Sequence, residues 1–276
     1  MATLPHTSTR ATFASDTPRE FWFATLFGGL TLAAWATLWL WSASPYRRYV
    51  DHGGLIDDGA LAALCRAIPA GDFVVPAALH AFAWLLMIAA MMLPTTYPLL
   101  MLFRRIVSGR ADATRLTWLV VAGFVAVWFA FGLVAHLADA ALQWEAQRSA
   151  WLTLNGWVAG AAILAGAGLF QFSALKYRCL EECHAPFAFV ASRWHGTAPL
   201  REALRLGLDH GSFCVGCCWA LMLCMFVVGT GSIGWMLVLA ALMAVEKNLP
   251  GGARLRLPVG LGLLAVAGTI VVARVV

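Results

Sequence analysis

Seven long apolar runs constrain this chain more than any other feature of its sequence. They lie at about residues 21–43, 73–103, 118–142, 151–175, 209–228, 233–247 and 257–274. A helix needs about 20 apolar residues to cross the hydrocarbon core of a bilayer. We therefore predict an all-α fold, a polytopic transmembrane helical bundle of about seven spans. The sixth run is the shortest of them and the weakest candidate for a full crossing.

The composition agrees with a membrane protein. Hydrophobic residues make up 61% of the chain and charged residues 12%, whereas soluble domains carry about 25% charged residues. These values exclude a soluble enzyme and a nucleic-acid-binding domain despite the net charge of +5. We expect the lipid bilayer to surround the protein and no nucleic acid to bind it. Residues 1–20 are interpreted as a polar leader and 21–276 as a single transmembrane domain.

The basic residues are unevenly divided between the predicted loops. Most of the 19 Lys and Arg residues fall on one side if the N-terminus is cytoplasmic, and loops rich in basic residues stay in the cytoplasm. The sequence thus predicts a multi-pass protein of the bacterial inner (cytoplasmic) membrane, with the N-terminus in and the C-terminus out. Residues 44–72 then form an outer loop with room for one short helix.

Two runs carry signals for their packing. Pro94 lies inside the second run, where the missing backbone donor predicts a kink. Gly156, Gly160, Gly166 and Gly168 in the fourth run are small residues at helical spacing. They predict close contact between helix backbones.

Two pairs of cysteines flank the predicted inner loop that follows the fourth run. Cys179 and Cys183 are four residues apart, and Cys214 and Cys217 are three apart, so each pair shares a helix face. If the pairs converge, they form a site of thiolates for Zn(II) or Cu(I). A reducing cytoplasm favours metal binding over disulfides at this place. The alternative is that the thiols are buried packing groups.

The packing alternative is the one we prefer for two other cysteines, Cys218 and Cys224. Soft thioether and imidazole ligands recur elsewhere, at His80, Met87, Met91, Met92, Met236 and Met243. The first three of these share one helical stripe, and the last two are seven residues apart and share another. They are candidate ligands for Cu(I), or residues that fill gaps between helices.

Ionisable residues in spans are candidates for function because their burial is costly. His80, His136 and Asp139 lie near the predicted outer ends of the second and third runs. They either form an outer metal site, with Asp139 as a ligand or as the partner of an imidazole, or belong to unrelated interfaces. Glu246 is a candidate ligand or proton carrier, and Lys247 is interpreted as a snorkelling anchor.

Four segments also resemble a known family in the same order. They are WLLMIAAMMLP (84–94), LKYRCLEECHAP (175–186), GSFCVGCCWALM (211–222) and WM followed by EK (235–247). Together they resemble the uncharacterised bacterial family of predicted metal-binding integral membrane proteins. The resemblance implies one shared site or scaffold, formed by Met87, Met91, Met92, Cys179, Cys183, Cys214, Cys217, Trp219, Met236, Glu246 and Lys247.

The ligands become softer from the predicted outer side to the inner side, which suits Cu(I). We therefore expect an integral membrane protein that binds a soft transition metal, with copper favoured and zinc as the alternative, and moves or hands it between an outer His site and an inner Cys site. One alternative is an accessory or assembly subunit with a structural metal site that braces a membrane protein partner. Another is an oxidoreductase that uses Cys214 and Cys217 with a quinone, or His80 and His136 with a haem. The question of an enzyme stays open.

Overall fold

The computed structural model describes residues 18–43, 71–228, 232–249 and 251–275. Every regular element in these ranges is helical, which confirms the all-α class. The predicted leader lies outside the described residues apart from 18–20, and the predicted outer loop lies outside them apart from 71–72. In chain order the elements are α1 (Pro18–Ala43), α3 (Gly71–Met87), η2 (Ile88–Met92), η3 (Pro94–Thr96), α4 (Tyr97–Ile106), α5 (Ala113–Arg148), α6 (Ala150–Leu154), α7 (Trp157–Phe170), α8 (Ala174–His184), α9 (Pro186–Ala191), α10 (Pro199–Val228), α11 (Ile233–Asn248), η4 (Gly252–Leu255) and α12 (Arg256–Val275).

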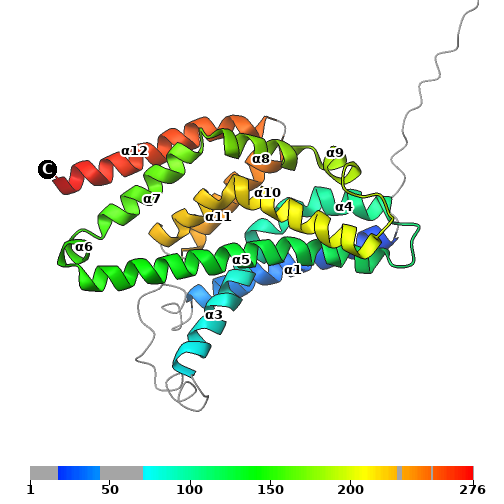
Figure 1. Cartoon of the computed structure of the whole chain (residues 1–276), viewed down its shortest axis with the longest axis horizontal. Coiled ribbons are helices and arrows are strands. Elements are labelled where there is room, and N and C mark those ends of the chain that lie inside the picture. Colours follow the sequence, from blue (N-terminus) through cyan, green and yellow to red (C-terminus); the bar gives the residue numbers. More distant parts are fainter. Residues whose placement is uncertain (1–17, 44–70, 229–231, 250, 276) are drawn as a thin grey trace, which may run out of the picture.

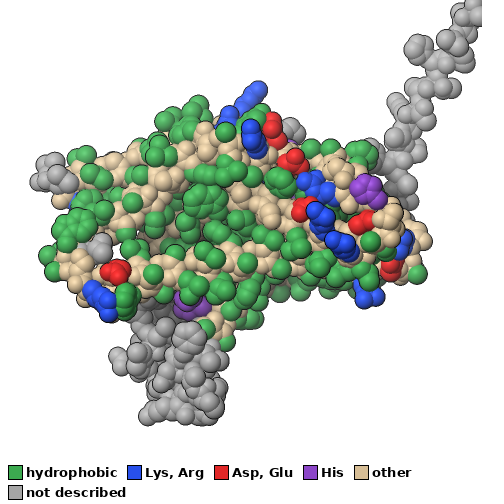
Figure 2. Space-filling model, viewed as in Figure 1, with side chains coloured by type: hydrophobic (Ala, Val, Ile, Leu, Met, Phe, Trp, Pro, Cys, Tyr) green, Lys and Arg blue, Asp and Glu red, His purple; other side chains and the backbone are tan. Residues whose placement is uncertain are grey.

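The helices have the length and the surface of membrane spans. Four are long and apolar enough to cross a bilayer, and the number rises to six if two bent pairs each count as one span. These six match the predicted runs except for the sixth run, which forms the 16-residue helix α11. Apolar side chains cover the flanks of the bundle, and most charged side chains on the visible face gather toward the end where α1 begins (Figure 2). The start of α1 and the C-terminal end of α12 lie at opposite ends of the long axis (Figure 1).

Helices α5 and α10 form the tightest interface of the bundle. A Cβ atom added to Gly123 of α5 would lie 2.6 Å from the carbonyl oxygen of Leu204 and 2.8 Å from the amide nitrogen of Leu208. Gly207 of α10 makes the reciprocal contact with the backbone of Val120. The two backbones approach this closely only because glycine has no side chain. This contact fixes α10, which carries Cys214, Cys217, Cys218 and Cys224, against the centre of the bundle.

The second predicted run bends where the sequence predicts a kink. The chain passes through a π-helical turn, Ile88–Met92, and then bends by 42° at Pro94 into α4. A π turn holds one residue more than an α turn and frees a carbonyl group from the regular ladder. The indole Nε1 of Trp35 in α1 donates to the carbonyl oxygen of Ala90 at 3.0 Å. Because the turn is wide, the adjacent Met91 and Met92 are both buried.

The fourth predicted run forms α6, α7 and the first residues of α8, and the rest of α8 lies in the predicted inner loop that follows the run. Helices α7 and α8 meet at 61°. Ser173 begins α8 as its N-cap, where its hydroxyl oxygen accepts from the amide of Lys176 at 3.1 Å. Of the glycines predicted to allow close packing, Gly168 contacts α12 and Gly160 lies against Val227, while Gly166 faces open space. The bend turns α8 across α10, so that the cysteines of the two helices come together.

Candidate metal centre

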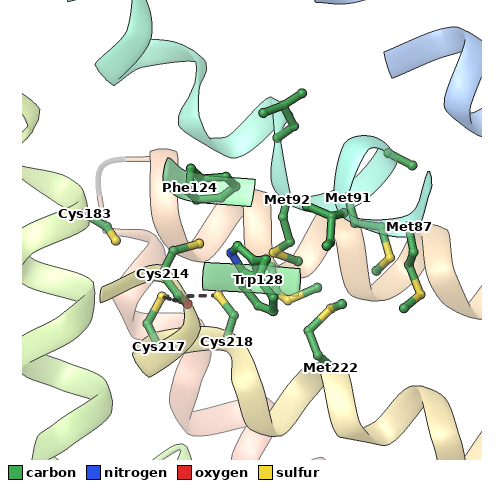
Figure 3. Packing of buried hydrophobic residues seen from close by; sticks show 14 of the residues in the cluster. Met87, Met91, Met92, Phe124, Trp128, Cys183, Cys214, Cys217, Cys218 and Met222 are labelled. Atoms are coloured by element: carbon green, nitrogen blue, oxygen red, sulfur yellow. Dashed lines mark hydrogen bonds between the residues drawn. The ribbon is translucent and has the colours of Figure 1, made fainter. Parts of the chain in front are cut away.

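Three thiols of α10 form a compact cluster. The sulfur atoms of Cys214, Cys217 and Cys218 all lie within 4.8 Å of one another. The Cys217 and Cys218 sulfurs are 3.2 Å apart, and the Cys217 thiol donates to the carbonyl oxygen of Cys214 at 3.2 Å (Figure 3). All three side chains are buried. Among the described residues, this is the one group of three or more His, Cys, Asp or Glu side chains close enough to share a metal ion.

The cluster includes a cysteine that the sequence pattern assigns to packing. Adjacent residues of a helix point about 100° apart, yet the side chains of Cys217 and Cys218 bring both sulfurs to the same side of α10. Cys218 is buried, as the packing interpretation expects, and the structure also places its sulfur beside those of Cys214 and Cys217. Cys224 agrees with the packing interpretation, because its thiol donates to the carbonyl oxygen of Ala220 at 3.4 Å.

The two cysteines of α8 lie against the same stretch of α10. Cys183 is buried, and its sulfur points toward Cys214 and Cys217 (Figure 3). Cys179 packs on Gly216, where an added Cβ atom would come 2.5 Å from its sulfur. The two predicted pairs thus converge in space. The compact cluster itself is formed by α10 alone, with Cys183 beside it.

Two buried lysines and one glutamate surround the thiols. Lys176 Nζ donates to Glu246 Oε2 at 2.7 Å, and both side chains are almost completely excluded from solvent. Lys247 Nζ donates to Cys214 Sγ at 3.1 Å and to Thr95 Oγ1 at 3.0 Å. The snorkelling interpretation of Lys247 was wrong, because its side chain points into the bundle and is 2% exposed. Glu246 and Lys247, in the last turn of α11, are both buried.

Buried methionine side chains lie beside the thiol cluster and extend away from it. The side chains of Met92, Met91 and Met87 point from η2 and α3 into the space beside α10, where Met222 faces them (Figure 3). Seven buried methionines belong to this core, namely Met87, Met91, Met92, Met222, Met225, Met236 and Met243. Met222 and Met225 are absent from the candidates chosen from the sequence. Their spacings of four and seven residues from Cys218 were a usable signal, because they place all three on one face of α10.

His80 and His136, which the sequence places near the predicted outer ends of their spans, lie against each other. The ring centroids of His80 and His136 are 4.5 Å apart. Both rings line a cavity of about 110 Å³ together with Trp84, Met87 and Met236. This cavity therefore joins the predicted imidazole site to the first methionines.

Asp139 lies one turn beyond His136 on α5. Its Oδ2 atom accepts from the side-chain amide of Gln143 at 2.7 Å. It lines a second cavity, beside Trp157 and Arg274, whose lining does not include the two histidines. The structure therefore places Asp139 near the imidazole pair in sequence but on the wall of a different cavity.

His210 is a further buried polar residue beside the thiols. It lies four residues before Cys214 on α10, between the rings of Phe124 and Phe189 at centroid distances of 5.7 and 5.5 Å. Neither ring nitrogen has a hydrogen-bond partner within the described part of the chain. The sequence shows this histidine in the cysteine-rich segment, but its i, i+4 spacing to Cys214 was not used to select it as a ligand.

The chemistry of the site agrees with a comparison against known families. The model of the PpoB2 family, described as a copper chaperone, matches residues 81–271. The chain belongs to this family. No curated protein and no solved structure matches the chain. The stretch matched to the PpoB2 copper chaperones begins one residue after His80 and contains every element that contributes a thiol to the cluster or a lysine beside it. Membership supports the predicted binding of a transition metal by this chain.

Proposed function

We propose that this protein is a membrane-embedded copper chaperone that carries Cu(I) as its cargo on Cys214, Cys217 and Cys218. The observation that carries the proposal is the cluster itself, three sulfur atoms within 4.8 Å of one another in a dry helical core. Thiolates are soft ligands that suit Cu(I), and the thiol protons leave when the metal binds. Cys183 stands beside the cluster as the sulfur that accepts or supplies the ion by ligand exchange (Figure 3).

The arrangement of the other soft ligands supports a direction for the transfer. The cavity lined by His80, His136, Met87 and Met236 receives the ion at the outer end of the bundle. Thioethers on η2 and α10 then lead toward Cys218. Each transfer exchanges one ligand for another and leaves the oxidation state unchanged. Because thioethers hold copper weakly and thiolates hold it strongly, the path runs toward the thiols.

The proposal also includes a position in the membrane and a protein that receives the copper. The protein spans the bacterial inner membrane several times, with the N-terminus in, the C-terminus out and the thiol cluster nearer the reducing side. The opposite positions of the described start of α1 and the end of α12 agree with this topology (Figure 1). A chaperone must release its cargo, so we expect a second membrane protein as the recipient.

A structural zinc site in an accessory subunit is the second candidate, because three thiols with Cys183 or His210 nearby also match the ligand set of closed zinc sites. The two functions differ in exchange. Structural zinc stays bound through washing and stabilises the fold, whereas cargo copper exchanges with a chelator. For a haem between His80 and His136, the ring centroids lie too close together to flank an iron porphyrin.

The test is the metal content of the protein purified in detergent, measured by mass spectrometry. A variant with Cys214, Cys217 and Cys218 changed to Ser is compared with the wild type and with Cys224→Ser. Cys224 is an equally buried thiol of the same helix and serves as the matched control. We expect about one copper per chain, removable by a Cu(I) chelator, in the wild type and in Cys224→Ser, and none in the triple variant. Zinc that resists washing, or equal copper in all three proteins, would contradict the proposal.

A further inference from the structure

A single buried ammonium group lies beside the thiol cluster without a carboxylate partner. Lys247 Nζ is 3.1 Å from Cys214 Sγ and 3.0 Å from Thr95 Oγ1, and it lies 5.8 Å from the centre of the Phe124 ring. Within the described residues no carboxylate forms an ion pair with it. A buried charge of this kind is costly unless the surroundings compensate it. Its position therefore calls for a reason other than stability.

The neighbouring charged residues do not cancel this charge. Glu246 precedes Lys247 in α11, but its Oε2 atom accepts from Lys176 at 2.7 Å. Lys176 and Glu246 thus form a neutral pair, and the net fixed charge of the three residues is that of Lys247. The three sulfurs lie within 4.8 Å of one another, and that of Cys214 is 3.1 Å from the ammonium nitrogen. A metal ion bound to these sulfurs would therefore lie roughly 5 Å from the charge of Lys247.

We propose that Lys247 makes the thiol cluster selective for monovalent soft cations over divalent ones. This inference rests on the proposed function of the cluster. An ammonium group has no lone pair and cannot be a ligand, so Lys247 acts through its charge. The repulsion between a bound ion and the ammonium doubles when the charge of the ion doubles. A lysine at this position therefore penalises Zn(II) and Cd(II) more than Cu(I) and Ag(I).

The expected size of the effect follows from Coulomb's law. At an effective dielectric constant of about 20 and a separation of roughly 5 Å, one additional unit charge on the ion changes the binding constant on the order of 100-fold. Lys247 is buried, so salt screens the repulsion only weakly. The selectivity should therefore persist at moderate salt concentration.

Ag(I) and Cd(II) are the probes that isolate charge, because both are soft d¹⁰ ions of neighbouring elements. Their affinities are measured by competition with chelators of known affinity on the full-length protein in detergent. Lys247→Gln keeps a group that can bond to Thr95 and removes the charge, and Lys247→Leu removes both. Lys247→Arg keeps the charge. The double variant Arg193→Met/Asp209→Asn removes another neutral ion pair, one that takes no part in the proposed metal site, and is the matched control.

We expect the Ag(I) to Cd(II) affinity ratio to fall on the order of 100-fold in Lys247→Gln and Lys247→Leu. The ratio should stay within a few fold of the wild type in Lys247→Arg and in the double variant. If one neutral variant does not fold, the other gives the result. A ratio that is unchanged in a neutral variant that still binds Ag(I) would overturn the inference about Lys247 and leave the thiol site intact. If Ag(I) instead binds equally well to the wild type and to the variant with Cys214, Cys217 and Cys218 changed to Ser, the proposed function is wrong.

Discussion

The buried ion pair of Lys176 and Glu246 gives the most quantitative test of the structure. It joins α8 to α11 at a nitrogen–oxygen distance of 2.7 Å, with side-chain exposures of 0% and 2%. The second oxygen of Glu246, Oε1, has no partner among the described residues. The pair is therefore the main compensation that the carboxylate has in this core.

Removing either partner alone should destabilise the protein strongly. Lys176→Met leaves a buried carboxylate and Glu246→Gln leaves a buried ammonium, and an uncompensated buried charge costs about 3–5 kcal/mol. The double variant contains neither charge and should lie within about 1 kcal/mol of the wild type. The stability losses of the two single variants then sum to several kcal/mol more than the loss of the double variant. The cycle of four proteins measures this coupling directly.

The assay is equilibrium unfolding in mixed micelles, in which a denaturing detergent is titrated and helix content is followed. The three variants and the wild type are compared under the same conditions. Additive single effects, with a coupling below about 0.5 kcal/mol, would show that the two side chains do not pair. That result would refute the reasoning from the structure.

Two further predictions concern packing and pH. Gly123→Ala should destabilise the protein by about 2 kcal/mol in the same unfolding assay, because the new methyl group meets the backbone of α10. Gly166→Ala meets no atom within 4 Å and should change stability by less than about 1 kcal/mol, so equal effects would contradict the α5–α10 contact. In the loop between α4 and α5, the Arg110 guanidinium donates to Asp112 and lowers the pKa of that carboxyl below its ordinary value of 3.8. The stabilisation that this pair gives is present above the unfolded pKa and disappears as the pH falls through the lower folded pKa. Arg110→Gln should return the pKa measured by NMR to its ordinary value, and a wild-type value above 3.8 would contradict the pairing.

The charge network would have been difficult to find from the sequence. Glu246 and Lys247 are adjacent, yet they contact different helices because their side chains leave α11 in different directions. Lys176 and Glu246 are separated by 70 residues. Sequence spacing gives the face of one helix that a residue occupies, but it does not give the rotation of that helix against its neighbours. The snorkelling interpretation of Lys247 failed for this reason.

The sequence was a better guide where a local signal determined the structure. The apolar runs predicted the helical class because a backbone in lipid must satisfy its own hydrogen bonds. Pro94 predicted the bend in the second run. The similar depths of His80 and His136 in two spans left open whether they meet, and the structure places their rings in contact.

The amino-acid sequence by itself determined the helical class of this protein, the place of one bend and the presence of soft ligands in its apolar segments. Run length, proline and residue type are local properties, and the chain carries them wherever its helices pack. The tertiary structure decided that Cys218 joins Cys214 and Cys217, and that Lys247 stands beside them. Both depend on the distances between side chains of different turns and different helices. The first depends on the side-chain conformations along α10, and the second on the packing of α11 against α10, which exists only when the whole bundle has packed.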